Sequence, residues 1–303
     1  MKSTRKIKDY DLLAGYSFFI PGPSGIFTLT LLFLVGALIG NVISAIFMLA
    51  MGSAGQDYMM LVSYPVMFIP PMMYALSKSR GNALFDQGCR IDSRHFGGPG
   101  AAGCCALVIL ATLCVAFIMD IFNAMMPEMP KWLEETLKNM TQGKFWVNFL
   151  CVSIFAPFFE EWLCRGMVLR GLLNYKRTDS RDGREYGIKP LWAIIISALF
   201  FAAIHLNPWQ ALPAFALGCL FGYVYYKTGS LWLTMLMHFA NNTSALIFSN
   251  IDSLKDADNF MDVLSVPVYS CIAAACAIAL FFAIRKISSI RLESVNGNCD
   301  IIG

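Results

Sequence analysis

The chain has 303 residues, of which 57% are hydrophobic and 14% are charged, and its net charge at pH 7 is +3. A soluble domain of this length cannot bury so much apolar surface, so the composition excludes an ordinary soluble protein. The small charge, without a basic cluster interleaved with aromatic residues, argues against a nucleic-acid partner. Ten cysteines are scattered along the sequence without a CxxC pair, a pattern that indicates neither a zinc ribbon nor a disulfide scaffold.

Membrane spans explain this composition, because a helix needs about 20 apolar residues to cross the hydrocarbon core. Eight stretches of suitable length are present in the sequence. We therefore predict an all-α fold, a polytopic helical bundle with about eight transmembrane helices. The stretches are Gly25 to Met51, Tyr58 to Ser77, Ala101 to Met125, Val147 to Leu173, Pro190 to Leu206, Trp209 to Tyr226, Ser230 to Phe248 and Val266 to Ile284.

The first stretch is expected to be a retained helix rather than a signal peptide. It is longer than a signal-peptide core, and no small-residue cleavage site follows it. We expect a cytoplasmic leader at 1–24, one membrane-embedded domain at 25–290 with a motif-bearing core at 147–249, and a cytoplasmic tail at 291–303.

The basic residues indicate how the helices are oriented. With eight spans, the loops on one side hold only Lys131, Lys138, Lys144 and Lys255, and all other Lys and Arg residues except Arg165 fall on the opposite side. Cytoplasmic loops are enriched in Lys and Arg, so both termini are expected to be cytoplasmic. This bias suits a bacterial plasma membrane, or the endoplasmic reticulum if the protein is eukaryotic.

Two polar segments interrupt the apolar pattern. Tyr175 to Lys189 is charged and contains Gly183 and Gly187, which is typical of a flexible loop. Lys131 to Trp146 alternates charged and apolar residues at helical spacing. An amphipathic helix at the membrane interface and an ordinary connecting helix both fit this second segment.

Three charged residues lie within the fourth stretch. Each charge inside a span costs about 2.5 to 3.5 kcal/mol on insertion scales, so each one needs a partner or a function. Glu161 and Arg165 are four residues apart on one helical face, where they can pair. Glu160 is rotated by about 100° and has no evident local cation. The three residues therefore either pair within the bundle or serve a reaction.

Two of the three histidines in the chain lie in apolar stretches. His205 follows Phe201 by four residues, and His238 precedes Asn242 by four, so His238 and Asn242 can converge on one polar target. His95 lies in a cytoplasmic loop and is given no role. A single buried histidine more often bonds a neighbouring carbonyl than acts in catalysis. A carboxylate, two imidazoles and an amide from three spans nevertheless suit peptide hydrolysis, which needs a base for water and donors for an oxyanion.

Three short motifs, in this order and in separate spans, resemble those of the CPBP family, the CAAX protease and bacteriocin-processing proteins. They are EExxxR at Glu160 to Arg165, FxxxH at Phe201 to His205 and HxxxN at His238 to Asn242. The family includes CAAX prenyl endopeptidases and bacterial Abi proteins. The resemblance covers about Phe155 to Asn242, and the first 145 residues add only membrane spans.

The resemblance implies a hydrolase, a glutamate-dependent intramembrane endopeptidase. It assigns Glu160 as the general base that activates water, with His205 assisting. His238 and Asn242 would stabilise the tetrahedral oxyanion, and the Glu161 and Arg165 pair would support the helix.

Family members are often described as metalloproteases, which leaves a metal-dependent alternative open. Glu160, His205 and His238 would then bind one divalent metal such as zinc, with water in the fourth position. The chain has no HExxH motif, and Asn242 suits an oxyanion donor better than a zinc ligand.

The expected partners are membrane lipid and a membrane-associated or lipidated protein or peptide substrate. A prenylated protein is one option, and bacteriocin maturation, self-immunity and processing of another membrane peptide are also compatible. A non-catalytic immunity or scaffold protein is an alternative that keeps the motifs but binds a partner. A proton- or ion-coupled transporter is a further alternative, against which stands the lack of an internal repeat.

Overall fold

The structure is a computed structural model that describes residues 12–290, except for 85–89, 93–95, 134–143, 179–184, 252–253, 255–256 and 258. The expected tail at 291–303 and His95 lie outside the described residues, as do the first 11 residues of the expected leader and most of the proposed interfacial segment.

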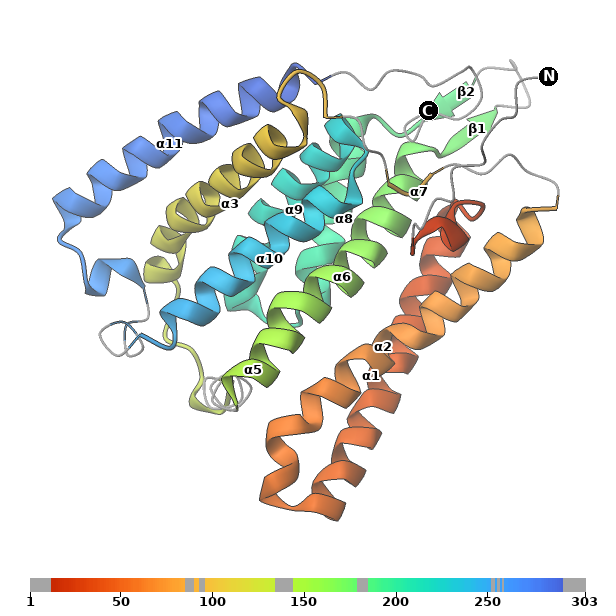
Figure 1. Ribbon diagram of the computed structural model, residues 1–303, viewed down its shortest axis with the longest axis horizontal. Coiled ribbons are helices and arrows are strands. Elements are labelled where there is room, and N and C mark those ends of the chain that lie inside the picture. Colours follow the sequence, from red (N-terminus) through yellow and green to blue (C-terminus); the bar gives the residue numbers. More distant parts are fainter. Residues whose placement is uncertain are drawn as a thin grey trace.

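The described chain is almost entirely helical, and successive long helices alternate in direction (Figure 1). Five short segments, from α5 to α7, follow one another directly and form one helix at Phe145–Leu173, which we call the central helix. The elements in chain order are η1 (Ala14–Tyr16), α1 (Pro23–Met51), α2 (Ser53–Asn82), α3 (Gly100–Met125), α5 (Phe145–Asn148), η2 (Phe149–Phe155), α6 (Ala156–Glu161), η3 (Trp162–Leu169), α7 (Arg170–Leu173), β1 (Lys176–Thr178), β2 (Glu185–Gly187), α8 (Pro190–Ile204), α9 (Pro208–Thr228), α10 (Leu231–Phe248), η4 (Phe260–Asp262) and α11 (Val266–Ser288).

Each of the eight predicted apolar stretches forms a helix, which confirms the all-α class. The second stretch, predicted at Tyr58 to Ser77, extends to Ser53–Asn82. Five helices are long and apolar enough to cross a membrane, and α8, α9 and α10 fall outside this set, so the count of eight spans stays a prediction. The five are Pro23–Met51, Tyr58–Asn82, Gly100–Phe122, Phe145–Leu173 and Val266–Ser288.

The polar segment at Tyr175 to Lys189 contains a short β-hairpin, which the sequence did not predict. β1 pairs antiparallel with β2, with Lys176 opposite Gly187 and Thr178 opposite Glu185. Every residue of both strands is exposed. Strands with no buried face lack the apolar alternation by which a strand is recognised.

The helices form a bundle with the central helix in its middle (Figure 1). The hairpin of α1 and α2 packs on one side of the central helix, and α8, α9 and α10 pack on the other. The remaining helices, α3 and α11, pair at the far edge, where α3 contacts α9 and α10. This arrangement places residues of α2, α8 and α10 around the middle of the central helix.

Residues 12–22 pack against the end of the central helix. Arg170 is buried and donates to the carbonyl oxygens of Tyr16 and Phe19 at 3.2 and 2.6 Å. A Cβ atom at Gly171 would overlap the carbonyl oxygen of Pro21, so only glycine permits this approach. The described part of the expected leader is therefore fixed to the bundle.

A buried carboxylate fixes the start of α10. Asp92 Oδ1 accepts hydrogen bonds from the backbone N–H groups of Leu231 and Trp232 at 2.7 and 3.3 Å, and from Ser230 Oγ at 3.1 Å. A carboxylate at a helix N-terminus satisfies otherwise unpaired N–H groups and interacts favourably with the helix dipole. The cap sets the position of the helix that carries His238.

Candidate active site

The central helix supplies two adjacent carboxylates from its middle. Glu160 and Glu161 end the α-helical segment α6, which lies between the π-helical segments η2 and η3. Pro157, the second residue of this segment, has no N–H to donate to the preceding turn, which favours a local change of helical geometry. π-helical turns are rare and are frequent at functional sites. Both glutamates thus lie in a short α-helical segment between two departures from α geometry.

Glu161 and Arg165 form the ion pair that their spacing predicts. Arg165 Nη1 donates to Glu161 Oε1 at 2.8 Å, and both side chains are fully buried. Arg165 Nη2 donates to the carbonyl oxygen of Gly218 at 3.1 Å. The guanidinium carbon lies 4.4 Å from the centre of the Phe201 ring, within range of a cation–π interaction. The pair therefore ties the central helix to α8 and α9.

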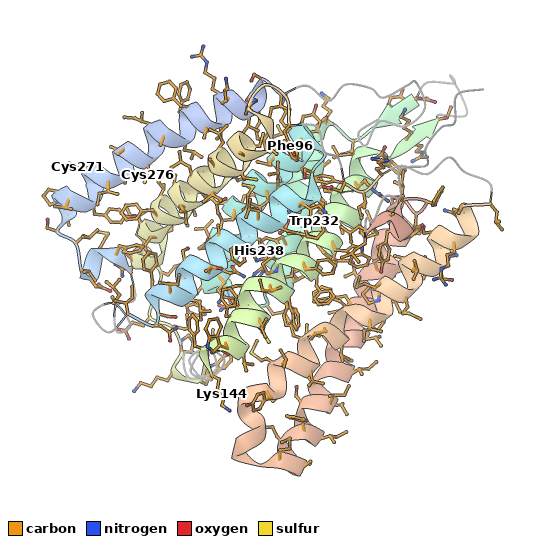
Figure 2. The ribbon with its side chains drawn as sticks, in the orientation of Figure 1. Phe96, Lys144, Trp232, His238, Cys271 and Cys276 are labelled. Atoms are coloured by element: carbon orange, nitrogen blue, oxygen red, sulfur yellow. The ribbon has the colours of Figure 1, made fainter. Side chains whose placement is uncertain are left out.

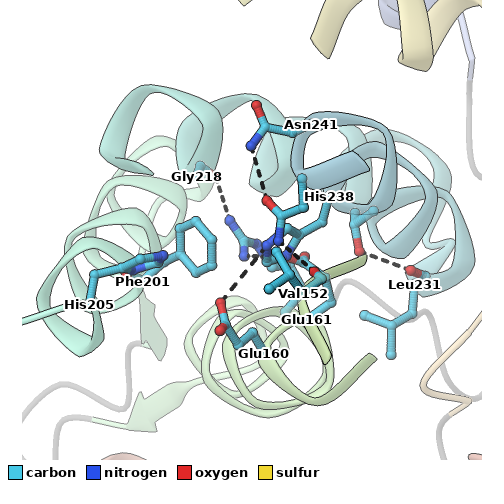
Figure 3. Close-up of polar contacts among 12 residues, drawn as sticks. Val152, Glu160, Glu161, Phe201, His205, Gly218, Leu231, His238 and Asn241 are labelled. Atoms are coloured by element: carbon cyan, nitrogen blue, oxygen red, sulfur yellow. Dashed lines mark hydrogen bonds and ion pairs between the residues drawn. The ribbon is translucent and has the colours of Figure 1, made fainter. Parts of the chain in front are cut away.

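His238 of α10 lies between the two carboxylates (Figure 3). Its Nδ1 is 3.0 Å from Glu161 Oε1, and its Nε2 is 3.9 Å from Glu160 Oε2. An ionised carboxylate only accepts hydrogen bonds, so Nδ1 carries the hydrogen in the contact with Glu161. Glu161 thereby fixes the orientation of the ring and directs Nε2 toward Glu160. Figure 2 shows His238 in the interior of the bundle, far from Lys144 at the end of the central helix.

The two oxygens of Glu160 have different surroundings. Oε1 accepts a hydrogen bond from the hydroxyl of Tyr64 in α2. Oε2 is buried and makes no hydrogen bond with any described residue. The side chain as a whole is 14% exposed, whereas that of Glu161 is fully buried. Oε2 is therefore the oxygen that remains available to a reactant.

His205 lies beside this cluster without joining it. Its Nδ1 donates to the carbonyl oxygen of Phe201 at 2.7 Å, which leaves Nε2 as an acceptor. The Phe201 ring lies between the two imidazoles, with its centre 4.9 Å from that of His205 and 5.4 Å from that of His238 (Figure 3). Within the described residues, His205 forms no ion pair with a carboxylate. It is bonded to a neighbouring carbonyl, as a non-catalytic buried histidine would be.

Asn242 lies one turn after His238 on α10. Its Nδ2 donates to the carbonyl oxygen of Val152 in η2 at 2.9 Å, and its Oδ1 accepts from Asn241 Nδ2 at 3.1 Å. Both His238 and Asn242 face the central helix, as the four-residue spacing predicts. A side-chain amide nitrogen carries two hydrogens, so the bond to Val152 leaves one for a substrate oxygen.

Comparison with known proteins identifies the segment that carries this cluster. Residues 142–244 match the family model described as type II CAAX prenyl endopeptidase, Rce1-like. These residues are therefore similar to the CAAX protease and bacteriocin-processing family. No curated protein and no solved structure matches the chain. The resemblance inferred from the three motifs is thus confirmed, and all the site residues predicted from them lie within the matched CAAX protease segment.

The arrangement does not fit the three-ligand metal site that was expected as an alternative for a CAAX protease. Among the described residues, no three His, Cys, Asp or Glu side chains come together at positions suitable for a metal. Glu160 and His238 approach each other, but the Phe201 ring lies between His205 and His238. No reaction step is therefore derived through a metal.

Tyr64 is the site residue that the sequence did not reveal. It lies outside the matched CAAX protease segment, 96 residues before its partner Glu160. A phenolic hydroxyl in an otherwise apolar helix was the only available signal, and Tyr58 and Tyr74 of the same helix share it. The contact depends on how α2 packs against the central helix, which no local pattern encodes.

A separate apolar cavity of about 380 Å³ lies away from this cluster. It is formed between α3, α9 and α11 and is lined by residues that include Val115, Leu220 and Ile284. None of the site residues of the CAAX protease segment lines it, so we assign it no part in the reaction.

Proposed function

We propose that this protein is an intramembrane endopeptidase that uses Glu160 to activate water for hydrolysis of a peptide bond. The match to CAAX endopeptidases supports the peptidase class. The observation that carries the proposed mechanism is the position of Glu160 Oε2, which is buried without a hydrogen-bond partner among the described residues and lies 3.9 Å from His238 Nε2. A base must reach the proton that it removes, and an unoccupied carboxylate oxygen satisfies this requirement.

The reaction begins with proton transfer from a water molecule to Glu160 Oε2. The water oxygen bonds to the carbonyl carbon of the scissile peptide, and the carbonyl oxygen becomes an oxyanion. A doubly protonated His238 would donate Nδ1–H to Glu161 and Nε2–H to this oxyanion. Asn242 would supply the second N–H of its amide. Both donors are held by contacts with the central helix, so little reorganisation is needed as charge develops.

Collapse of the tetrahedral intermediate completes the reaction. The carbonyl bond re-forms, the carbon–nitrogen bond breaks, and the leaving amine takes the proton that Glu160 received from water. The products are a carboxylic acid and an amine, the acid then passes its proton to the amine to give a carboxylate and an ammonium group, and Glu160 has returned to its ionised state. His205 is proposed as the assisting residue through its Nε2 acceptor, acting on water or substrate, because it does not contact Glu160.

The proposed substrate is a membrane-associated or lipidated protein or peptide. Its scissile bond must enter the bundle to reach Glu160, because the cluster lies in the middle of the central helix. A prenylated CAAX protein is one member of this class, and a bacterial membrane peptide is another.

The decisive experiment measures cleavage of membrane-anchored peptides by purified protein in lipid vesicles. The panel contains prenylated and unmodified peptides. We expect Glu160→Gln to lower kcat by about 10²- to 10⁴-fold, the usual contribution of a general base. Glu185→Gln makes the same chemical change on the exposed strand β2 and should cleave at the wild-type rate. Wild-type rates for Glu160→Gln would contradict the mechanism.

A chelator tests the metal-dependent alternative in the same assay. Because His205 does not join Glu160 and His238, we expect cleavage to continue at an unchanged rate after treatment with chelator. Loss of cleavage that is restored by zinc would contradict this expectation and would require His205 to move. If the wild-type protein cleaves no peptide, the non-catalytic binding alternative is favoured.

A further inference from the structure

The contact between Tyr64 and Glu160 joins the N-terminal hairpin to the catalytic cluster. Tyr64 lies on α2, and its hydroxyl donates to Glu160 Oε1. A hydrogen bond from a neutral donor to a carboxylate is stronger than one between two neutral groups. The matched family segment begins at residue 142, so this donor comes from a part of the chain that the family match does not cover.

Aromatic packing one turn away holds Tyr64 against the central helix. Phe68, four residues after Tyr64, is 1% exposed and stacks on Phe159 with ring centres 5.1 Å apart and an angle of 15° between the ring planes. Phe33 of α1 also packs on Phe68, with ring centres 5.3 Å apart. Phe159 immediately precedes Glu160, so this stack aligns the phenol with the carboxylate.

Close packing with α1 supports the same turn of α2 from behind. A Cβ atom at Gly36 would overlap the carbonyl oxygen of Met67, and one at Gly40 would lie 2.9 Å from that of Ser63. These two contacts flank Tyr64 in the sequence. Two glycines four residues apart allow helix backbones to approach closely in a membrane. The hairpin therefore holds the backbone around Tyr64 at a defined distance from the central helix.

We propose that Tyr64 is a positioning residue for the general base and that the α1–α2 hairpin is part of the active site. A carboxylate can present either oxygen to a reactant by rotating about its terminal bond. The Tyr64 hydroxyl has one hydrogen to donate and holds Oε1 with it. Oε2 then faces His238, which Glu161 holds in orientation from the other side. Tyr64 thus holds Glu160 and Glu161 holds His238, so both partners of the contact between Glu160 and His238 are fixed.

This inference rests on the proposed function, and kinetics of Tyr64→Phe test it. The substitution keeps the ring that packs on Phe68 and removes only the hydroxyl. Because a hydrogen bond to a charged group is lost, we expect kcat to fall about tenfold to a hundredfold. KM should stay within about twofold, because the lost interaction acts on the base and not on substrate binding.

Tyr58→Phe is the matched control. Tyr58 lies on the same helix and accepts a hydrogen bond from Lys144 at 2.6 Å, so this variant also loses one hydroxyl contact between α2 and the N-terminal end of the central helix. It should keep wild-type kcat. An unchanged kcat for Tyr64→Phe, or an equal loss in Tyr58→Phe, would overturn the inference. Two other results would contradict the proposed peptidase function instead. They are cleavage at the wild-type rate by Glu160→Gln and the absence of any cleavage by the wild-type protein.

Thermal unfolding in lipid or detergent tests the contact without any substrate. The midpoints of wild type, Tyr64→Phe, Glu160→Ala and the double variant form a cycle. We expect Tyr64→Phe to shift the midpoint less in the Glu160→Ala background, because its partner is already absent. Tyr58→Phe should cause the same shift in both backgrounds. Additive shifts for Tyr64 and Glu160 would show that the hydroxyl does not hold the carboxylate and would overturn the inference.

Discussion

A fully buried ion pair organises the site at the scale of single residues. Replacement of Arg165 by Met removes the partner of Glu161 together with the hydrogen bond to Gly218. A buried carboxylate is then left without its cation, so we expect the free energy of unfolding to fall by about 3 to 5 kcal/mol. Chemical denaturation of the purified variant in detergent measures this change.

The double variant Glu161→Gln with Arg165→Met separates charge from packing. It removes both charges, and the Gln oxygen can still accept from His238 Nδ1. Most of the lost stability should therefore return, because neutralising both members of a buried pair costs less than removing one. A double variant as unstable as Arg165→Met alone would show that shape, rather than the unpaired charge, causes the loss.

At the scale of elements, the approach of α1 to α2 has a defined weak point. Gly36→Ala places a methyl group against the carbonyl oxygen of Met67, and this backbone atom cannot move without displacing α2. Overpacking of this kind costs about 1 to 3 kcal/mol. We expect a lower unfolding midpoint and a lower kcat, because the displaced turn carries Tyr64. Thermal unfolding and peptide cleavage measure the two effects.

Gly81→Ala, on the partner helix α2, is the control for this prediction. A Cβ atom at Gly81 would have no heavy atom within 4 Å, so the added methyl group displaces nothing. In a helix, alanine is favoured over glycine by about 0.8 to 1.0 kcal/mol, so this variant should be at least as stable as the wild type. If Gly36→Ala behaves in the same way, the close packing does not position α2.

The elements also show which features the sequence could predict. Helix positions and the pairing of Glu161 with Arg165 follow from local spacing and were predicted correctly. The shared direction of His238 and Asn242 was predicted for the same reason. The bond from Tyr64 was not predicted, because it joins residues 96 positions apart and depends on packing between helices. Gly36 and Gly40, four residues apart in the first stretch, were an available signal for the close hairpin.

Sequence spacing also could not predict the separation of His205 from the other site residues. The FxxxH spacing places Phe201 and His205 on one face of α8, and in the structure the histidine bonds the carbonyl of that same phenylalanine. Whether the His205 imidazole also reaches Glu160 depends on how α8 packs against the central helix. Local sequence determines which side chains share a face, and tertiary packing determines which of them meet.

At the scale of the whole molecule, the number of crossing helices decides where the two ends lie. The five helices that are long and apolar enough to span would place the termini on opposite sides if they alone crossed. If α8, α9 and α10 also cross, eight helices span the membrane and the two termini lie on the same side. These three helices contain 15, 21 and 18 residues, or about 22, 31 and 27 Å of helix. Only α8 is clearly shorter than the hydrocarbon core, which is about 30 Å thick.

α8 is apolar and falls outside the set of five because of its length, whereas the site explains why α9 and α10 are less apolar. α10 carries His238, and α9 accepts the Arg165 hydrogen bond through Gly218. A helix that lines a polar cluster inside the bundle needs fewer apolar residues than one that faces lipid on most sides. We therefore predict that all eight helices cross and that both termini lie in the cytoplasm, as the distribution of basic residues indicates.

Reporter fusions in a bacterial host test this topology. Green fluorescent protein fused to either terminus should fluoresce, because it folds in the cytoplasm. Alkaline phosphatase should be inactive at either terminus and active when it is inserted near Pro127, between α3 and the central helix. Paired insertions near Asn250, between α10 and α11, distinguish the two counts, because eight spans place this turn outside the cytoplasm and five spans leave it in the cytoplasm. Active phosphatase at the C-terminus, with a fluorescent N-terminus, would mean an odd number of crossings. At least one of α8, α9 and α10 would then not span, and the approach of α10 to the central helix would need another explanation.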